Sequence, residues 1–374
     1  MSLQLNSMIS KSKYSLLLIV TLLVVTIFVA SCEKETQEEF YTFDVGFETQ
    51  GISRGIFLDA QDQVQLYFVR TNNDPKILFF TPQGKLQDSI VFNFPLLKPI
   101  NNLHLYAKDT LINIVSQLNI VQFINEKGNI VSEKKLYDYI NPKYHSEDIL
   151  FIKPDFHNSI YKKNKDRSIY GISNFFTDDF FRRNSDFNHY LRENAKSYKA
   201  LIISHLFDDS MVVELGLKGM FFDEKDPFRS VEVLDERIVA YNQDYFIFSA
   251  HAPFLYIYDD TLHLKKDIKL IDRSIHEGAT QYIHDVLYDY RTEFVAVVLA
   301  NIVPQSGRVD LKEEQIVSFD VSIYNGDWQK QQSFHFNAQE YSPYSIYLIQ
   351  NNMYVENIKN ATYGQVNYQL FSIL

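Results

Sequence analysis

Cysteine is almost absent from this chain: Cys32 is the single cysteine among 374 residues. A disulfide framework and a zinc site built from thiolates both need several cysteines, so neither can form within the chain. Glycine is scarce too, with 12 residues, and no glycine-rich phosphate loop, Gly-x-Ser-x-Gly elbow or His-Glu-x-x-His motif occurs. The fold must therefore depend on an apolar core, and the sequence contains no standard catalytic signature that would indicate a function.

Basic residues are outnumbered: 36 Lys and Arg stand against 47 Asp and Glu. An acidic surface repels nucleic acid and anionic membranes. The sequence therefore predicts no nucleic-acid partner. Phe, Tyr, Ile and Val are abundant, with 30 Phe and 25 Tyr. These residues favour strands over helices.

The N-terminus has the order of a secretory signal. Lys11 and Lys13 precede an apolar run, 16–30, which is short of the roughly 20 residues that a membrane-spanning helix needs. The run ends in Val-Ala-Ser-Cys at Cys32, which resembles a bacterial lipobox, whose cysteine becomes the lipidated first residue. We therefore predict a signal peptide over 1–31 and an acidic tether over 32–39. An uncleaved anchor helix is the alternative.

Lipidation of Cys32 by two or three acyl chains would hold the domain on a membrane, because each buried methylene contributes about 0.8 kcal/mol. The mature chain keeps 34 basic and all 47 acidic residues, a formal charge of −13. The acidic residues after Cys32 resemble the export tag of surface-displayed lipoproteins. The sequence thus predicts an outer-membrane lipoprotein, displayed on the surface or facing the periplasm.

A hairpin pattern recurs along the chain. Each copy is an apolar strand, a turn containing Asp, Asn or Gly, and a second strand. Shorter strand pairs precede most copies, so each unit holds four strands, as in a propeller blade. The five hairpins are predicted over 76–92, 119–136, 200–217, 254–270 and 315–336.

The two ends of the chain each supply a strand without a hairpin partner, 40–47 and 366–374. Pairing them in one blade would remove two exposed edges. We therefore predict an all-β fold, a six-bladed β-propeller over 40–374 with closure by the N- and C-terminal strands. An insertion over about 175–199, with a short helix, explains the longest gap between hairpins. A seven-bladed ring and a pair of β-sandwiches are the alternatives.

The lipobox, the six-unit pattern and four short segments resemble the six-bladed β-propeller lipoproteins of Bacteroidota. The segments are Gly219-Met-Phe-Phe, Tyr245-Phe-Ile-Phe-Ser-Ala, Leu255-Tyr-Ile-Tyr-Asp and Ile283-His-Asp-Val-Leu-Tyr-Asp-Tyr-Arg. The function of this group is largely unknown, so the resemblance implies fold and location rather than an activity.

One segment combines imidazole, carboxylate and guanidinium groups: His284, Asp285, Asp289 and Arg291. Asp289 and Arg291 would share one face of a strand, as an ion pair or as a clasp for a polar ligand. We predict a ligand site at the channel mouth here, with an internal strut between blades as the alternative. His276 and His284 stand eight residues apart, a spacing that fits no metal site, so we expect no metal and no cofactor.

Four short motifs, Asp-(Ser/Thr)-aliphatic, resemble the O-glycosylation acceptor of exported proteins in Bacteroidota. The acceptor residues would be Ser89, Thr110, Ser210 and Thr261. Ordinary hairpin turns also produce this pattern.

Two classes of function remain open. The first is a non-catalytic binding or assembly module for an envelope protein, peptide or glycan. The second is a hydrolase or lyase that acts on polysaccharide through carboxylates, suggested only by fold analogy and aromatic content.

Overall fold

The computed structural model describes these residues: 39–48, 53–58, 63–70, 75–93, 103–107, 110–115, 120–135, 172–174, 200–202, 213–214, 236–241, 244–249, 253–259, 263–272, 280–289, 291–303 and 315–373. The chain divides into two compact units, Met1–Glu39 and Phe40–Leu374. The described residues form strands and turns and contain no helix, so the expectation of an all-β fold is confirmed. The predicted insertion, helix and signal peptide lie outside them.

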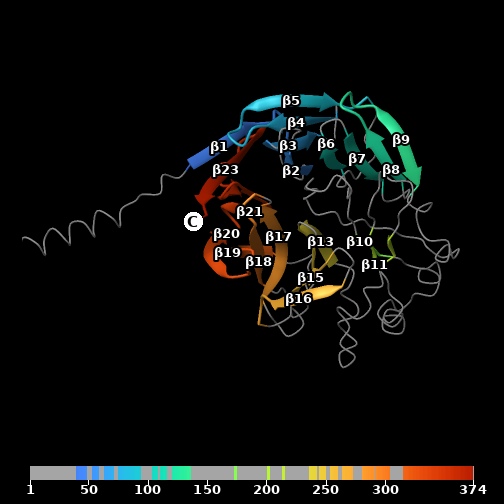
Figure 1. Ribbon diagram of the computed structural model, residues 1–374. Coiled ribbons are helices and arrows are strands. Elements are labelled where there is room, and N and C mark those ends of the chain that lie inside the picture. The colour runs from blue at the N-terminus through green and yellow to red at the C-terminus, as the bar shows by residue number, and fades with distance from the viewer. Residues whose placement is uncertain are drawn as a thin grey trace, which may run out of the picture. The chain divides into compact units, whose positions relative to one another are not determined.

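The strands form six antiparallel sheets in chain order (Figure 1). Their bounds are β2 (Ser53–Leu58), β3 (Val64–Arg70), β4 (Lys76–Phe80) and β5 (Leu86–Val91) in one sheet, and β6 (Leu103–Ala107), β7 (Thr110–Val115), β8 (Ile120–Ile124) and β9 (Ile130–Lys135) in the next. The third holds β10 (Ile172–Asn174), β11 (Ala200–Ile202) and β12 (Val213–Glu214), and the fourth β13 (Glu236–Tyr241), β14 (Asp244–Ser249), β15 (Phe254–Tyr258) and β16 (Leu264–Lys269). The fifth holds β17 (Gln281–Asp289), β18 (Phe294–Val303), β19 (Gln315–Tyr324) and β20 (Lys330–Asn337).

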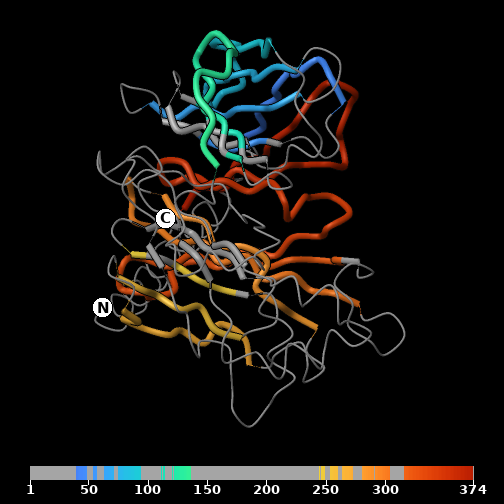
Figure 2. Tube along the Cα trace, turned by 90° about the vertical axis from the view of Figure 1, so that its right-hand side faces the viewer, coloured from blue at the N-terminus to red at the C-terminus, as the bar shows by residue number. Residues whose placement is uncertain are grey.

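The sixth sheet joins both ends of the chain. Its order is β1 (Glu39–Asp44), β23 (Gln365–Ser372), β22 (Asn352–Asn357) and β21 (Tyr341–Ile349). In Figure 2 the blue N-terminal strand accordingly runs beside a red C-terminal one. Two strands that would otherwise leave open edges therefore share a sheet, as the sequence predicts.

Four of the predicted hairpins use one turn design. The first turn residue is Thr81, Asn125, Asp259 or Asn325, and its backbone N–H donates to the carbonyl oxygen four residues later at 2.9–3.1 Å. Its side-chain oxygen accepts a hydrogen bond from the backbone N–H of that same residue at 2.8–3.2 Å. Short oxygen-bearing side chains suit this local bond, which explains why Thr, Asn and Asp recur.

The fourth position of the turn lies against the preceding sheet. Gly84 and Gly128 adopt left-handed φ values of 85° and 73° there. A Cβ on Gly84 would lie 2.4 Å from the carbonyl oxygen of Thr42, and one on Gly128 would lie 1.9 Å from that of Val91. These two glycines are required by conformation and by close approach.

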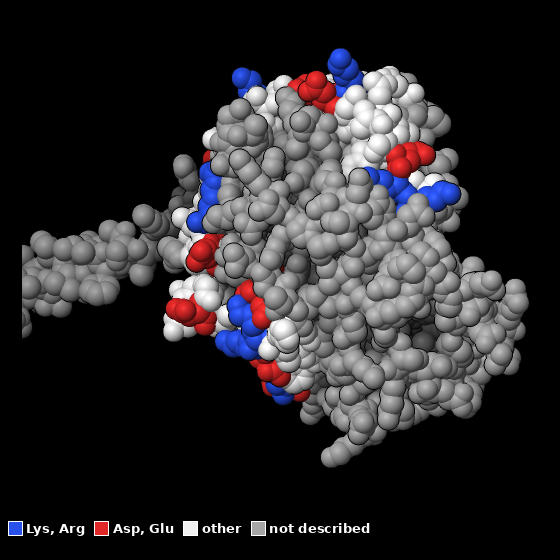
Figure 3. All heavy atoms as spheres, turned by 45° about the vertical axis from the view of Figure 1, so that its right-hand side comes forward, with Lys and Arg blue, Asp and Glu red and all other residues white. Residues whose placement is uncertain are grey.

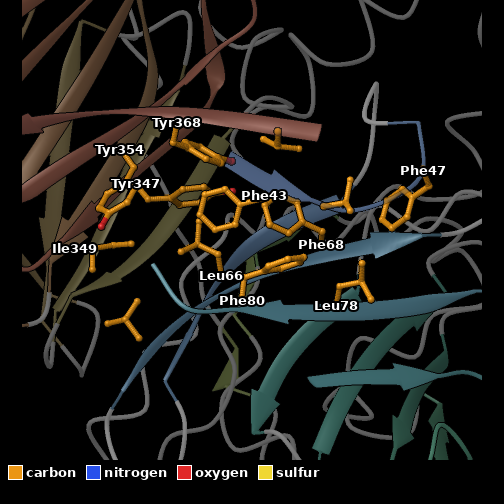
Figure 4. Packing of buried hydrophobic residues seen from close by; sticks show 13 residues of the cluster. Phe43, Phe47, Leu66, Phe68, Leu78, Phe80, Tyr347, Ile349, Tyr354 and Tyr368 are labelled. Atoms are coloured by element: carbon orange, nitrogen blue, oxygen red, sulfur yellow. The ribbon is translucent and has the colours of Figure 1, made fainter. Parts of the chain in front are cut away.

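The hydrophobic core lies between successive sheets. The cluster between the sixth and first sheets contains Phe43 of β1, Phe68 and Phe80 of the first sheet, and Tyr368 of β23 (Figure 4). Phe43 contacts the other three rings at centroid distances of 5.5–5.6 Å. Other clusters join the first sheet to the second, the fourth to the fifth and the fifth to the sixth.

The fourth strand of the first, second, fourth and fifth sheets is largely exposed, as the burial patterns of β5, β9, β16 and β20 show. Lysines on β9, β16 and β20 discourage pairing with another chain. Acidic and basic side chains alternate over the described part of the face in Figure 3. None of the described segments is a helix able to cross a membrane.

Candidate functional site

The first strands of the sheets approach one another: β2 contacts β6, β13 contacts β10 and β17, and β17 contacts β21. Two of these strands are irregular. In β17 the pairing register shifts between Ile283 and Asp285, so His284 is the extra residue of a β-bulge. Such bulges re-aim a side chain and are common beside functional sites.

The second irregularity lies in β21. Tyr341 pairs with Asn357 and Ile346 pairs with Val355, so the four residues 342–345 face Glu356 alone. Ser342 Oγ accepts a hydrogen bond from the Tyr344 backbone N–H at 3.3 Å and supports the bulge. Tyr344 projects from it with 69% of its surface exposed.

The two bulges contact each other. The rings of His284 and Tyr344 meet at a centroid distance of 4.8 Å and an interplanar angle of 80°. His284 is buried, and its Nδ1 lies 3.3 Å from the hydroxyl oxygen of Tyr282. An exposed tyrosine is thus braced by a buried imidazole from the neighbouring sheet. Such a rigid aromatic surface suits contact with a ligand or a partner protein.

Asp285 and Asp289 have local roles. Asp285 Oδ1 accepts a hydrogen bond from the backbone N–H of Val286 at 2.8 Å, and Asp289 Oδ1 accepts one from that of Arg291 at 2.9 Å. β17 ends at Asp289, so Arg291 lies in the turn and is exposed, whereas Asp289 is buried. The interpretation that Asp289 and Arg291 share one strand face is therefore wrong, although their ligand role stays a prediction.

A second polar cluster lies between the first and sixth sheets. Arg54 of β2 donates from Nη1 to Oε1 of Glu356 on β22 at 2.8 Å, and both side chains are mostly buried. Burial opposes the charge of Arg54, but Tyr368, Glu356 and Tyr347 favour it and raise its pKa above the usual value. The guanidinium therefore stays charged.

Hydroxyl groups surround this ion pair. Ser345 Oγ and Tyr368 Oη share a short hydrogen bond. Burial raises the pKa of Tyr347 and Tyr368, so both phenols stay protonated at neutral pH. Among the described residues, Tyr347 Oη and Glu356 Oε2 are buried oxygens without a hydrogen bond of ordinary geometry. Ser345 and Tyr368 lie close enough to the Tyr347 hydroxyl to lower its pKa in part, but less than burial raises it.

The other predicted residues lie in different places. Ser89 is exposed on β5, where its backbone N–H donates to Asp88 Oδ1. Thr110 begins β7, and its side chain lies outside the described residues, as do Ser210, Thr261 and Cys32. Their modification stays a prediction. Within the described ranges, no group of three or more His, Cys, Asp or Glu side chains could hold a metal ion.

Sequence reasoning missed Tyr344, Arg54 and Glu356. Pro343 inside a strand-forming segment was the available signal for the bulge, since proline interrupts strand pairing. No sequence signal links Arg54 to Glu356, which lie 302 residues apart.

Comparison with known proteins identifies a fold. No family model matches the chain, and no curated protein matches it. A crystal structure of a member of the DUF4221 family from Bacteroides vulgatus is similar with a TM-score of 0.62 at 12% identity, covering 90% of this chain and 97% of that one. The fold is that of a β-propeller. Lower TM-scores relate the chain to a Cps50 (Swd1) β-propeller domain from Myceliophteria thermophila (0.42, 9% identity, 90% and 100% covered) and to virginiamycin B lyase from Staphylococcus aureus (0.43, 11% identity, 90% and 100% covered).

Proposed function

We propose that this protein is an exported lipoprotein of the Bacteroidota propeller type, anchored in the outer membrane through Cys32, with a six-bladed propeller that binds a partner without catalysis. Six sheets in chain order and the pairing of β1 with β23 support six blades and closure by the terminal strands. The basic, apolar and lipobox segments support the anchor.

The observation that carries the binding role is the contact of His284 with Tyr344. Both residues come from bulged first strands, and one presents an exposed ring. Aromatic anchors on rigid strands contribute much of the affinity at protein and glycan interfaces. The surface around Tyr344 is thus the proposed contact for an envelope protein, peptide or glycan.

A carboxylate-based hydrolase or lyase would need two carboxylates about 5–10 Å apart on either side of a substrate. Asp285 and Asp289 instead accept backbone hydrogen bonds, and Glu356 is paired with Arg54. These described acids therefore favour the binding module.

Cross-linking in living cells tests the contact. A photoreactive phenylalanine replaces Tyr344 in one strain and Tyr363 in another, because Tyr363 is 82% exposed but lies in the turn before β23. The proposal expects one discrete adduct from position 344 and none from position 363. Equal adducts from both positions, or none from either, would contradict it.

The anchor is tested separately by the variant Cys32→Ala, with metabolic labelling by an alkyne fatty acid. We expect loss of the label and of membrane attachment, and retention of both would exclude a lipid on Cys32. Protease treatment of intact cells then distinguishes surface display from a periplasmic location.

A further inference from the structure

The fifth sheet carries a polar stripe across all four of its strands. The members of the polar stripe are Gln281 of β17, Asn301 of β18, Ser318 and Asp320 of β19, and His335 of β20. In the strand register Gln281 pairs with Asn301, Asn301 pairs with Ser318, and Asp320 pairs with His335. Residues directly opposite each other, and residues two apart on one strand, share a face, so all five side chains lie on one face of the sheet.

The polar stripe begins where the apolar core on this face ends. Val297 and Leu299 of β18 belong to the core cluster between the fourth and fifth sheets, and Asn301 is the next residue of the same alternation. The opposite face stays apolar at this end of the sheet, where Phe319 and Phe336 pack toward the sixth sheet. Half-buried amides and a carboxylate stabilise a sheet less than apolar side chains would, so core packing does not explain the polar stripe.

Hydrogen bonds fix the side chains of the polar stripe. Gln281 Nε2 donates to Asn301 Oδ1 at 3.0 Å and to Asp320 Oδ2 at 3.2 Å. Asn301 Nδ2 donates to the same carboxylate oxygen at 3.0 Å and to Ser318 Oγ at 3.1 Å. His335 Nδ1 lies 2.7 Å from Asp320 Oδ1. Each side chain is therefore held by a neighbour, and little conformational entropy is lost when a ligand binds.

These internal bonds occupy the amide donors and leave acceptors for a ligand. A carboxylate only accepts hydrogen bonds, so His335 donates to Asp320 from Nδ1, and the neutral ring presents Nε2 as an acceptor. None of the described residues donates to Gln281 Oε1, and this oxygen is not among the buried oxygens that lack a partner. The polar stripe therefore suits a ligand that is rich in hydrogen-bond donors.

The polar stripe is open to solvent. The side chain of His335 is 67% exposed and that of Asp320 is 34% exposed, and the other three residues are half-buried. From β17 to β20 the polar stripe extends over three strand spacings, about 14 Å. One ammonium or hydroxyl group cannot reach both ends of a surface of this length. A chain of sugar residues can, because its hydroxyl donors repeat along it.

We propose that the polar stripe binds a short neutral glycan, whose hydroxyls donate hydrogen bonds to Gln281 Oε1, to the carboxylate of Asp320 and to His335 Nε2. The ligand is neutral because the charge of Asp320 repels the carboxylate of an acidic sugar. The site rests neither on Tyr344, which belongs to the sixth sheet, nor on the lipid anchor.

Calorimetry with a set of trisaccharides tests the ligand class. The full-length protein, in a detergent without a sugar headgroup, is titrated with neutral trisaccharides of glucose, mannose, galactose and N-acetylglucosamine, and with trigalacturonate and spermidine. At least one neutral trisaccharide should bind, and trigalacturonate should bind at least about tenfold more weakly than the best of them. Binding of no neutral trisaccharide would overturn the proposal. Tighter binding of spermidine than of every trisaccharide would also overturn it and assign the polar stripe to a cation.

Asp320→Asn tests the role of the histidine tautomer. The new amide oxygen can still accept from Gln281 and Asn301, while its NH2 group donates to His335 Nδ1. The ring proton then moves to Nε2, which changes from an acceptor into a donor. Glycan affinity should fall by about tenfold or more, and nitrogen NMR of the histidine rings should show the change of tautomer. A loss of stability alone would not change the tautomer.

Further variants locate the glycan. Gln281→Met removes the acceptor at the other end of the polar stripe and should weaken binding about tenfold. His263→Ala is the control, because His263 is an 82% exposed histidine beside Asp259 in a turn of the fourth sheet, and it should leave the affinity unchanged. Full affinity in both Asp320→Asn and Gln281→Met, or an equal loss in His263→Ala, would overturn the proposal. A loss confined to Tyr344→Ala would place the glycan at the Tyr344 surface instead and would also overturn it.

Discussion

The ring of Trp328 meets the ring of Phe246 at a centroid distance of 5.3 Å and an angle of 68°, across the boundary between the fifth and fourth sheets. Trp328 occupies the turn position that Gly84 and Gly128 hold in earlier sheets, with a φ of 63°. The chain accepts a left-handed tryptophan here because its side chain packs into the neighbouring sheet.

Substitutions at Trp328 should separate the contribution of its ring packing from the strain of its left-handed backbone. Trp328→Ala loses the ring contacts but keeps the backbone strain, so the free energy of unfolding should fall by about 2–3 kcal/mol. Trp328→Gly loses the same contacts and relieves the strain, so it should be about 1 kcal/mol more stable than the alanine variant. Urea denaturation followed by circular dichroism measures both, and equal stability of the two variants would rule out strain at this position.

Trp328 is also the only tryptophan of the chain. Its fluorescence therefore reports this sheet boundary alone in the unmodified protein. A two-state domain should show the same urea midpoint by fluorescence and by circular dichroism. An earlier fluorescence midpoint would mean that this boundary opens before the rest of the domain.

Gly128 provides a second test of the turn design. Gly128→Ala should destabilise the protein by at least about 2 kcal/mol, because a left-handed alanine is strained and its Cβ would collide with the carbonyl of Val91. Gly326→Ala is the matched control, because its Cβ would meet only Glu293 Oε2 at 3.7 Å. Thermal melting of both variants should show a large shift for Gly128→Ala and almost none for the control.

Much of the fold could be predicted from the sequence because its signals are local. Strand alternation and turn residues such as Asn125 and Asn325 determine hairpins within about fifteen residues. The bulge at His284 could not be predicted, since its register depends on how β18 pairs with β17. The bulge in β21 has a sequence signal in Pro343. The position of Arg291 in the candidate site depends on where β17 ends. The sequence pattern predicts Arg291 on the strand, but β17 ends at Asp289 and Arg291 lies in a turn.

Tyr347 should make stability depend on alkaline pH. Burial raises its pKa above that of the unfolded chain, so the folded state retains the phenolic proton longer. This contribution is complete below about pH 10 and is lost as the pH rises toward the folded pKa, at up to about 1.4 kcal/mol per pH unit. Tyr347→Phe should flatten the decline in unfolding free energy above pH 10. A decline of the same slope in both proteins would show that Tyr347 ionises as readily folded as unfolded.

Deleting residues 366–374 tests how the two ends of the chain hold the sixth sheet together. The deletion removes most of β23, which pairs with β1 on one side and β22 on the other, and it uncovers Phe43 by removing Tyr368. Because both strands lose their hydrogen-bonded neighbour and a core cluster loses one wall, we expect loss of the cooperative thermal transition rather than a small shift. Deletion of residue 374 alone leaves β23 intact and should melt like the full chain. A protein lacking 366–374 that melts cooperatively at the original temperature would show that the domain does not need β23, or its pairing with β1, for stability.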